Sequence, residues 1–332
     1  MSSLSEIIRV LKALPGPDES ARAGVSLRAR DVLRPLGAFA RLDEVAIWLA
    51  GWQRTDRPHV AAPALLVFVA DHGVASQGVS AYPQDVTAAM FEALRQGAAT
   101  ASVLAADVGA SVSVIDAGVG RPTGDISVDP AMDDVRFHEA FEAGRDSVRS
   151  LDADILVLGE MGIGNTTAAA AVSAALFDMA PEDWTGRGTG VDDATYRRKV
   201  ELVGRARGRV NHDDAFEILR ELGGLEMVAL AGAGLEARLR SIPVVLDGFV
   251  VTAALAALEV ARPGALDHCF AGHLSPEPGH SLLLEKLGKQ PLLDLDLRLG
   301  EGSGALAALP LIRMAAAAVV EVATFAEWGL AR

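Results

Sequence analysis

The stretch ILVLGEMGIGNTTAAAAVSAA, residues 155–175, predicts the local arrangement on which the rest of the fold depends. Its first four residues are apolar and partly β-branched, as in a buried parallel strand. The alanine-rich run that begins near Asn165 is typical of a helix, and three glycines lie between the two elements. The sequence therefore predicts a strand, a glycine loop and a helix, the basic unit of an α/β fold.

The glycine loop is suited to an anionic ligand. Backbone N–H groups at a helix start are unpaired and lie at the positive end of the helix dipole, so they favour phosphate. Gly162 and Gly164 allow close approach to the backbone, while Asn165 and Thr166 can hydrogen-bond to phosphate oxygens. Glu160 would repel phosphate, so we expect it to bind a sugar hydroxyl or to orient a donor. A tight turn that binds nothing is the alternative, but it does not explain the Asn-Thr-Thr sequence.

A second loop has a similar form. Residues 295–304 read LDLRLGEGSG, and a long helical pattern begins at Ala305. Both loops contain Leu-Gly-Glu followed by glycines and a helix, so two such turns at the carboxyl ends of parallel strands could face one cleft. Glu301 would then stand between glycines in the position of a general base. A Glu on an exposed, flexible loop is an equally good interpretation of this segment alone.

The balance of charge excludes several classes of partner. The 332 residues include 44 acidic and 30 basic side chains, a formal net charge of −14. This charge opposes non-specific binding to nucleic acid and to anionic membranes, so the expected ligand is small. Cys269 is the single cysteine, which fits a reducing compartment, and we interpret it as a small buried apolar residue. The charged N-terminal segment lacks the pattern of a signal peptide, which predicts a cytoplasmic protein.

The order of patterns along the chain predicts two domains. Residues 5–14, 19–33 and 42–53 show helical spacing before the first strand, and no strand is available to cover them. We expect a small helical domain over residues 1–60, completed by about residues 305–332. The α/β domain is expected over residues 61–304. Its predicted strands cover residues 64–70, 111–116, 155–158, 242–246 and 265–270.

Two further loops carry polar groups. Ser80, Tyr82 and Gln84 follow the first predicted strand and offer a hydroxyl, an aromatic face and an amide, a set that suits a flat heteroaromatic base. Capping of the next helix would also explain them. Residues 186–190, GRGTG, precede a helix with Lys199, which predicts a second anion contact, although a solvated basic helix face is as good an interpretation.

Two motifs do not support the sites that they suggest. Residues 232–237, GAGLEA, match a dinucleotide-binding fingerprint, but the residues before them are helical, so we interpret the small residues as a helix-packing surface. His268, His273 and His280 lack the spacing of a known zinc site, and Asp71 and His72 are expected to point apart. A predicted helix over residues 212–222 and a strand over residues 242–246 follow the basic helix in the chain.

Six segments together resemble the nicotinate-nucleotide–dimethylbenzimidazole phosphoribosyltransferases of cobalamin nucleotide-loop assembly. They occur in the order of the family and extend over most of the chain from residue 64 to residue 328. Residues 34–43, RPLGAFARLD, depart from the KPPGSLGRLE-like segment of that family. The matching segments are ADHGVASQGVSAYPQDVT, GEMGIGNTTAAAA, GRGTGVDD, IPVVLDGFVVTAA, SPEPGH and LRLGEGSGA.

The resemblance implies a dimeric enzyme with a Rossmann-like sheet domain and a helical domain made from both chain ends. It implies transfer of phosphoribose from nicotinate mononucleotide to 5,6-dimethylbenzimidazole with inversion, without a cofactor or metal. Glu301 corresponds to the general base, and Glu160 lies near the ribose. The implied nucleotide contacts are Gly162, Gly164, Asn165, Thr166, Gly188, Lys199 and Ser275, and the implied base contacts are Ser80, Tyr82, Gln84 and Leu299. A transferase with another acceptor base and a non-catalytic nucleotide-binding regulator remain alternatives.

Overall fold

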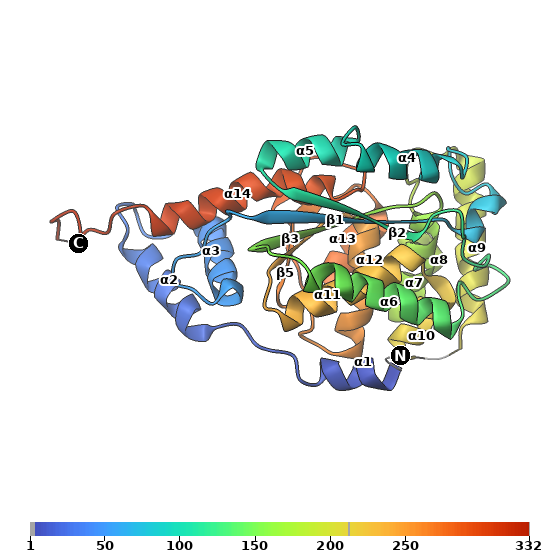
Figure 1. The fold of residues 1–332 in the computed structure, drawn as a ribbon, viewed down its shortest axis with the longest axis horizontal. Coiled ribbons are helices and arrows are strands. Elements are labelled where there is room, and N and C mark those ends of the chain that lie inside the picture. The colour runs from blue at the N-terminus through green and yellow to red at the C-terminus, as the bar shows by residue number, and fades with distance from the viewer. Residues whose placement is uncertain (1–3, 212, 332) are drawn as a thin grey trace.

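The computed structural model describes residues 4–211 and 213–331. Its centre is a sheet of five parallel strands in the order β2-β1-β3-β4-β5 (Figure 1). The predicted α/β class with a parallel sheet is therefore confirmed. The strands are β1 (Pro63–Ala70), β2 (Ser111–Gly118), β3 (Ile155–Met161), β4 (Val244–Leu246) and β5 (Cys269–Ala271); a separate parallel pair is formed by β6 (His273–Leu274) and β7 (Leu293–Asp294).

Helices cover both faces of the sheet, and the alternation of side chains along the strands explains why. Leu66 and Phe68 of β1 point into one apolar core with α6, α7, α10, α11 and α12, whereas Leu65 and Val67 point into a second core with α3, α5 and α14. Both faces of β1 are buried, and all of its residues are apolar. These helices are α3 (Ala40–Gln53), α5 (Thr100–Val108), α6 (Asp134–Arg149), α7 (Asn165–Phe177), α10 (Ala215–Leu222), α11 (Leu225–Leu239), α12 (Phe249–Ala261) and α14 (Ser303–Val320).

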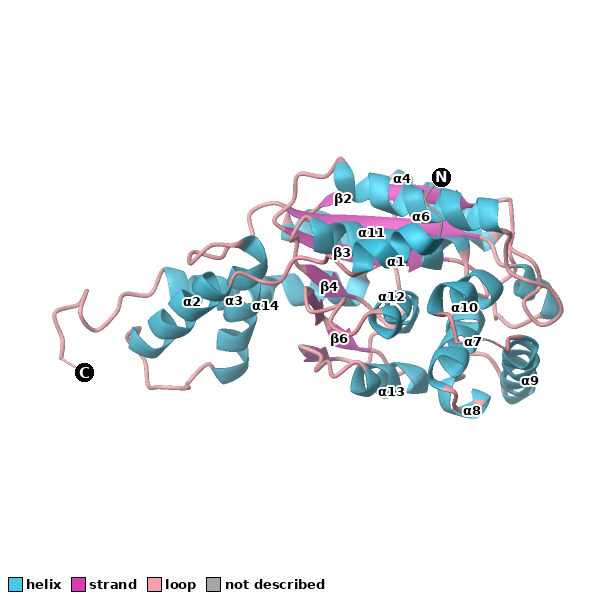
Figure 2. Ribbon diagram, turned by 90° about the horizontal axis from the view of Figure 1, so that it is seen from below, coloured by secondary structure: helices cyan, strands magenta, loops and turns pink. Residues whose placement is uncertain are grey.

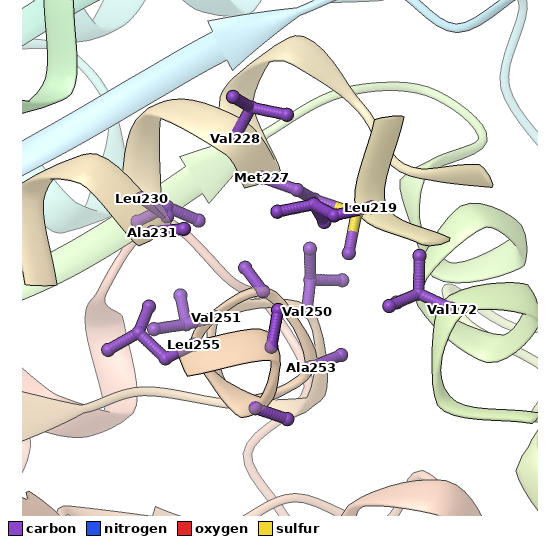
Figure 3. Close-up of a cluster of buried hydrophobic side chains, with 14 of the residues drawn as sticks. Val172, Leu219, Met227, Val228, Leu230, Ala231, Val250, Val251, Ala253 and Leu255 are labelled. Atoms are coloured by element: carbon purple, nitrogen blue, oxygen red, sulfur yellow. The ribbon is translucent and has the colours of Figure 1, made fainter. Parts of the chain in front are cut away.

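α12 is buried in the first core along most of its length. Figure 3 shows Val250 and Val251 of this helix among side chains of α10 and α11, such as Leu219 and Leu230. Gly232 of α11 permits close packing on α6, because a Cβ there would lie 2.1 Å from the carbonyl oxygen of Phe141. The rejected dinucleotide fingerprint therefore lies inside a buried helix and serves helix packing, as predicted.

A group of helices projects from one end of the sheet. α2 (Glu19–Asp31) and α3 pack against α14, and Figures 1 and 2 show α2 and α3 at the end of the molecule near the C-terminus, while α14 runs from there back along the sheet. α1 (Leu4–Leu11) instead contributes Ile7 and Leu11 to the first core. α14 is the one helix in the described ranges that is long and apolar enough to cross a membrane, and 56% of it is buried, including Ile312 in the second core.

Several predicted boundaries differ from the structure. Residues 295–299 form an irregular segment after β7, because their leucines are partly exposed and have no sheet partner. Residues 265–268 form a turn, so the last strand begins at Cys269. α10 begins at Ala215, since the Asp214 carboxylate accepts hydrogen bonds from the next turn at 2.9 and 3.1 Å, and His212 lies outside the described residues. The other elements are η1 (Gly73–Gln77), α4 (Val86–Arg95), α8 (Pro181–Trp184), α9 (Asp193–Arg209) and α13 (Pro278–Lys286).

Candidate active site

A cavity of about 400 Å³ lies beside the carboxyl end of β3. The strand order places β3 beside β1, where the connections leave in opposite directions, and open α/β sheets bind ligands at this switch point. Twelve of the thirteen residues predicted to form the site line this cavity; Gln84 does not. The twelve are Ser80, Tyr82, Glu160, Gly162, Gly164, Asn165, Thr166, Gly188, Lys199, Ser275, Leu299 and Glu301.

Glu160 is a buried carboxyl group at the end of β3. The amide nitrogen of Asn165 donates a hydrogen bond to its carboxylate, and its backbone carbonyl accepts one from Glu301 N at 3.1 Å. Burial, together with the negative charges of Asp247, Glu226 and Glu301, raises the pKa of Glu160 well above its usual range. This carboxyl group therefore holds a proton at a higher pH than an exposed Glu.

Glu301 is held in a strained backbone conformation. Its φ is 61°, a left-handed value that few residues other than glycine adopt, and Gly300 and Gly302 on either side are also left-handed. The loop lies directly on β3, because a Cβ on Gly159 would be 2.4 Å from the carbonyl carbon of Glu301. Contact with β3 thus fixes the position of the loop at residues 300–302.

The side chain of Glu301 is buried, so the interpretation as an exposed surface Glu is wrong. Only 2% of the residue is accessible, and its carboxylate accepts a hydrogen bond from Ala101 N at 3.4 Å. Burial raises the pKa of Glu301. The hydrogen bond from Ala101 lowers this pKa, and the negative charge of Asp247 raises it. A buried carboxylate of raised pKa is a better proton acceptor than an exposed one.

Another part of the cavity contains a buried basic group. Lys199 extends from α9 and is 1% exposed, and its ammonium donates a hydrogen bond to the Thr166 hydroxyl at 3.1 Å. Gly188, with φ 53°, lies against both groups. Burial lowers the pKa of Lys199, and Glu277 opposes this shift. The basic residues of α9 are thus not one solvated face, since Arg197 and Arg198 are exposed while Lys199 is enclosed.

The start of α7 completes the positive part of the cavity. Gly164, with φ 98°, precedes the helix and leaves its first N–H groups without a side-chain cap. Gly162 is required for close packing, since a Cβ there would lie 2.5 Å from Ala70 O and 3.2 Å from the His72 ring. His72 in turn forms a buried pair with Glu226 at 2.8 Å. The loop therefore packs on the ring of His72, whose partner Glu226 is a third buried carboxylate near the cavity.

The remaining wall is mostly apolar. Tyr82 and Leu299 stand at its edge and are about half exposed. Side chains of this kind enclose a flat, weakly polar ring well. The other apolar residues that line the cavity include Val79, Val86, Met90, Ile163, Phe249, Val250 and Leu297.

The histidines do not come together as metal ligands. His280 Nδ1 lies 3.0 Å from Ser275 N, and its Nε2 lies 3.3 Å from the Thr252 hydroxyl. His268 pairs with the carbonyl oxygen of Gly234 at 3.0 Å. Within residues 4–211 and 213–331, no three His, Cys, Asp or Glu side chains are placed to hold a metal ion.

Cys269 is buried, which raises the pKa of its thiol to about 12.

Some residues of the site were not identified from the sequence. His273 and Glu277 line the cavity, and Asp247 lies beneath it, 1% exposed. The signal for Asp247 was an acidic residue directly after the apolar run VVL and before a glycine, at the expected end of a strand. No comparable local signal marks Glu277, which reaches the cavity because α13 begins beside residues 186–188.

Comparisons with known proteins agree with this geometry. Residues 14–330 match a family model described as Phosphoribosyltransferase. A nicotinate-nucleotide–dimethylbenzimidazole phosphoribosyltransferase from Jannaschia sp. (strain CCS1) is 48% identical over 99% of this chain and 98% of its own length. A protein of the same name from Ruegeria pomeroyi is 47% identical with the same coverage. The crystal structure of CobT from Thermus thermophilus superimposes with a TM-score of 0.91 at 43% identity, covering 94% of this chain and 99% of that chain.

Proposed function

Because the chain belongs to the nicotinate-nucleotide–dimethylbenzimidazole phosphoribosyltransferase family, we propose that it transfers phosphoribose from nicotinate mononucleotide to 5,6-dimethylbenzimidazole. The products are nicotinate and α-ribazole 5′-phosphate, for cobalamin biosynthesis. One observation of the structure carries this proposal. A single cavity has two buried carboxyl groups, Glu160 and Glu301, in one part and an anion-binding set around Lys199 in another.

The reaction breaks the bond between the ribose C1 and the nicotinate nitrogen and forms a bond from C1 to a benzimidazole nitrogen. The bonding electrons leave with nicotinate, so positive charge develops on the ribose. Attack from the opposite face inverts the configuration at C1. Glu301 accepts the proton from the second benzimidazole nitrogen, and Glu160 lies where a carboxyl group can bind the ribose.

The positive part of the cavity suits the 5′-phosphate. Lys199, the Thr166 hydroxyl and the backbone at Gly188 face one another, and the start of α7, which has no side-chain cap, lies beside them. Binding energy from this remote group holds the donor while its other end reacts. The nucleotide is thereby oriented with its phosphate toward Lys199 and its ribose C1 toward Glu160 and Glu301.

The test is a chromatographic assay of purified protein with nicotinate mononucleotide and 5,6-dimethylbenzimidazole. We expect nicotinate and the new nucleotide to appear in equal amounts. A parallel series with adenine and a phenol as acceptors distinguishes a related transferase of other specificity. Binding of the nucleotide without release of nicotinate with any acceptor would contradict the proposed reaction and favour a non-catalytic binding protein.

We also propose that the protein is a cytoplasmic homodimer, as the family resemblance implies. The apolar side chains of Leu295 and Leu299 near the cavity are 59% and 50% exposed, and Tyr82 is 52% exposed, which suits coverage by a second chain. Light scattering coupled to size-exclusion chromatography measures the mass directly. A species of 34.6 kDa at micromolar concentration would contradict the dimer.

A further inference from the structure

Asp247 is a buried carboxylate that does not line the cavity. It follows β4 directly and is 1% exposed. Its Oδ2 accepts a hydrogen bond from Gly302 N at 3.2 Å, and its Oδ1 accepts one from Ala305 N at 3.0 Å. Both donors lie within four residues of Glu301 in the chain. Asp247 is therefore bonded to the segment that carries the proposed general base.

These two bonds form an N-cap supplied by a distant strand. The capping position of α14 is Gly302, which has no side chain, so the helix cannot cap itself. Asp247 satisfies two N–H groups at the helix start and places negative charge at the positive end of its dipole. The start of α14 is thus fixed to the sheet by one side chain.

The charged and titratable groups around Asp247 come from four elements. Glu160 lies on β3, Glu301 precedes α14, His273 lies on β6 and His280 on α13. His273 Nε2 is 3.4 Å from the Asp247 carboxylate, and the charge of Asp247 also acts on His280. The negative charge of Asp247 raises the pKa of both Glu160 and Glu301.

We propose that Asp247 is a positioning residue of the reaction, which holds the Glu301 segment in place and sets a negative charge beneath the two cavity carboxyl groups. This inference rests on the proposed function. Cap formation alone requires no charge, because a neutral Asn or Ser also caps helices well. A buried carboxylate has a desolvation cost that a neutral cap avoids, so the charge itself needs an explanation. A negative charge at this place makes Glu301 a stronger proton acceptor and stabilises the positive charge that develops on the ribose, which explains why the capping group is charged.

The test compares Asp247→Asn with a matched control, Asp154→Asn. Asp154 is also a poorly exposed carboxylate that accepts two backbone hydrogen bonds, from Ala61 N at 2.5 Å and Ala62 N at 2.8 Å, but it precedes β3 and does not line the cavity. Both variants lose a carboxylate that binds two backbone N–H groups, although Asp247 uses both oxygens and Asp154 uses only Oδ2. The control therefore measures the loss of a charged backbone contact away from the cavity, and the pH dependence of kcat separates the proposed role of Asp247 from a purely structural one.

The readouts are kcat, KM for the nucleotide, and kcat as a function of pH from about pH 5 to about pH 9. Removal of the negative charge of Asp247 favours the charged form of Glu301, so the pH at which kcat falls on the acid side moves lower. We expect this shift and a loss of at least about tenfold in kcat for Asp247→Asn, with KM changed less than about threefold. Asp154→Asn is expected to keep the wild-type kcat and pH profile.

Two further measurements keep the test decisive. If Asp247→Asn does not fold, Asp247→Ser keeps one neutral acceptor for the helix start and is measured in the same way. A ¹³C NMR titration of labelled Glu carboxyl groups reports the pKa of Glu301 without turnover, and it should be lower in either variant. A folded variant whose acid limb and Glu301 titration match the wild type overturns the proposal, whatever its kcat. Absence of nicotinate release by the wild type would instead refute the proposed function, and the titration would still decide the role of Asp247.

Discussion

The substitution Glu301→Gln removes a proton acceptor and leaves almost every contact of the segment in place. Gln has the same length, and its amide oxygen can still accept the hydrogen bond from Ala101 N. The backbone bond from Glu301 N to Glu160 O does not involve the side chain. We therefore expect the variant to fold and to bind the nucleotide as the wild type does.

The expected effect on turnover follows from the role of the group. A positioned general base typically contributes about 10² to 10⁴ in rate, or about 2.7 to 5.4 kcal/mol. Lys199 and Gly188 are proposed to bind the other end of the donor, so KM for nicotinate mononucleotide should change by less than about threefold. The loss should therefore appear in kcat.

The assay is steady-state release of nicotinate with saturating 5,6-dimethylbenzimidazole. The matched control is Glu259→Gln, because the Glu259 carboxylate also accepts two backbone hydrogen bonds, from Gly264 N and Leu266 N, at a site that does not line the cavity. The control should keep wild-type turnover. A folded Glu301→Gln enzyme with kcat within about fivefold of wild type would refute the assignment of Glu301 as the base.

Three other predictions test separate parts of the site. Lys199→Met should raise KM for the nucleotide by about 10- to 100-fold through loss of a charge-assisted hydrogen bond, and an unchanged KM would exclude Lys199 from phosphate binding. The raised pKa of Glu160 means that folding loses stability as pH rises above the usual range of a Glu, so Glu160→Gln should raise the unfolding midpoint in calorimetry at neutral pH, and the gain should vanish at acid pH. Gly159→Ala should lower kcat and stability, because its Cβ would meet Glu301, whereas Gly16→Ala, where a Cβ meets nothing within 4 Å, should be near neutral on both measurements.

The sheet could be predicted because its signal is local. β1 and β3 are buried on both faces, so an apolar run followed by polar or glycine residues is visible in the sequence. The bounds of the edge strand at residues 269–271 were harder to predict, since three residues are too few to show the alternation of apolar and polar side chains that marks a strand. The glycine loop after residues 295–299 was placed at the carboxyl end of a strand by analogy with the loop after residues 155–158, but residues 295–299 have no sheet partner, which only the three-dimensional fold decides.

The site could be predicted only where its residues lie in glycine-rich loops. Glu160 and Glu301 were found because each follows Leu-Gly at a loop, but nothing local indicated that Glu301 is buried in a left-handed conformation. Asp247 was overlooked since its partners are 55 and 58 residues away in the chain. Burial and long-range bonds depend on the packing of α14 against β3 and β4, which no single segment encodes.

The charges of the cavity explain how one site can orient the donor and favour its cleavage. Glu160 and Glu301 line one part of the cavity with Asp247 close to them, while Lys199 and the Thr166 hydroxyl line another part. A nucleotide that entered with its phosphate toward the carboxyl groups would meet like charge, so the reverse orientation is favoured. As the bond to nicotinate breaks, positive charge moves onto the ribose, where nearby carboxylates stabilise it. The grouping of buried carboxyl groups, which has a cost for stability, thus contributes both to orientation of the donor and to cleavage of its bond to nicotinate.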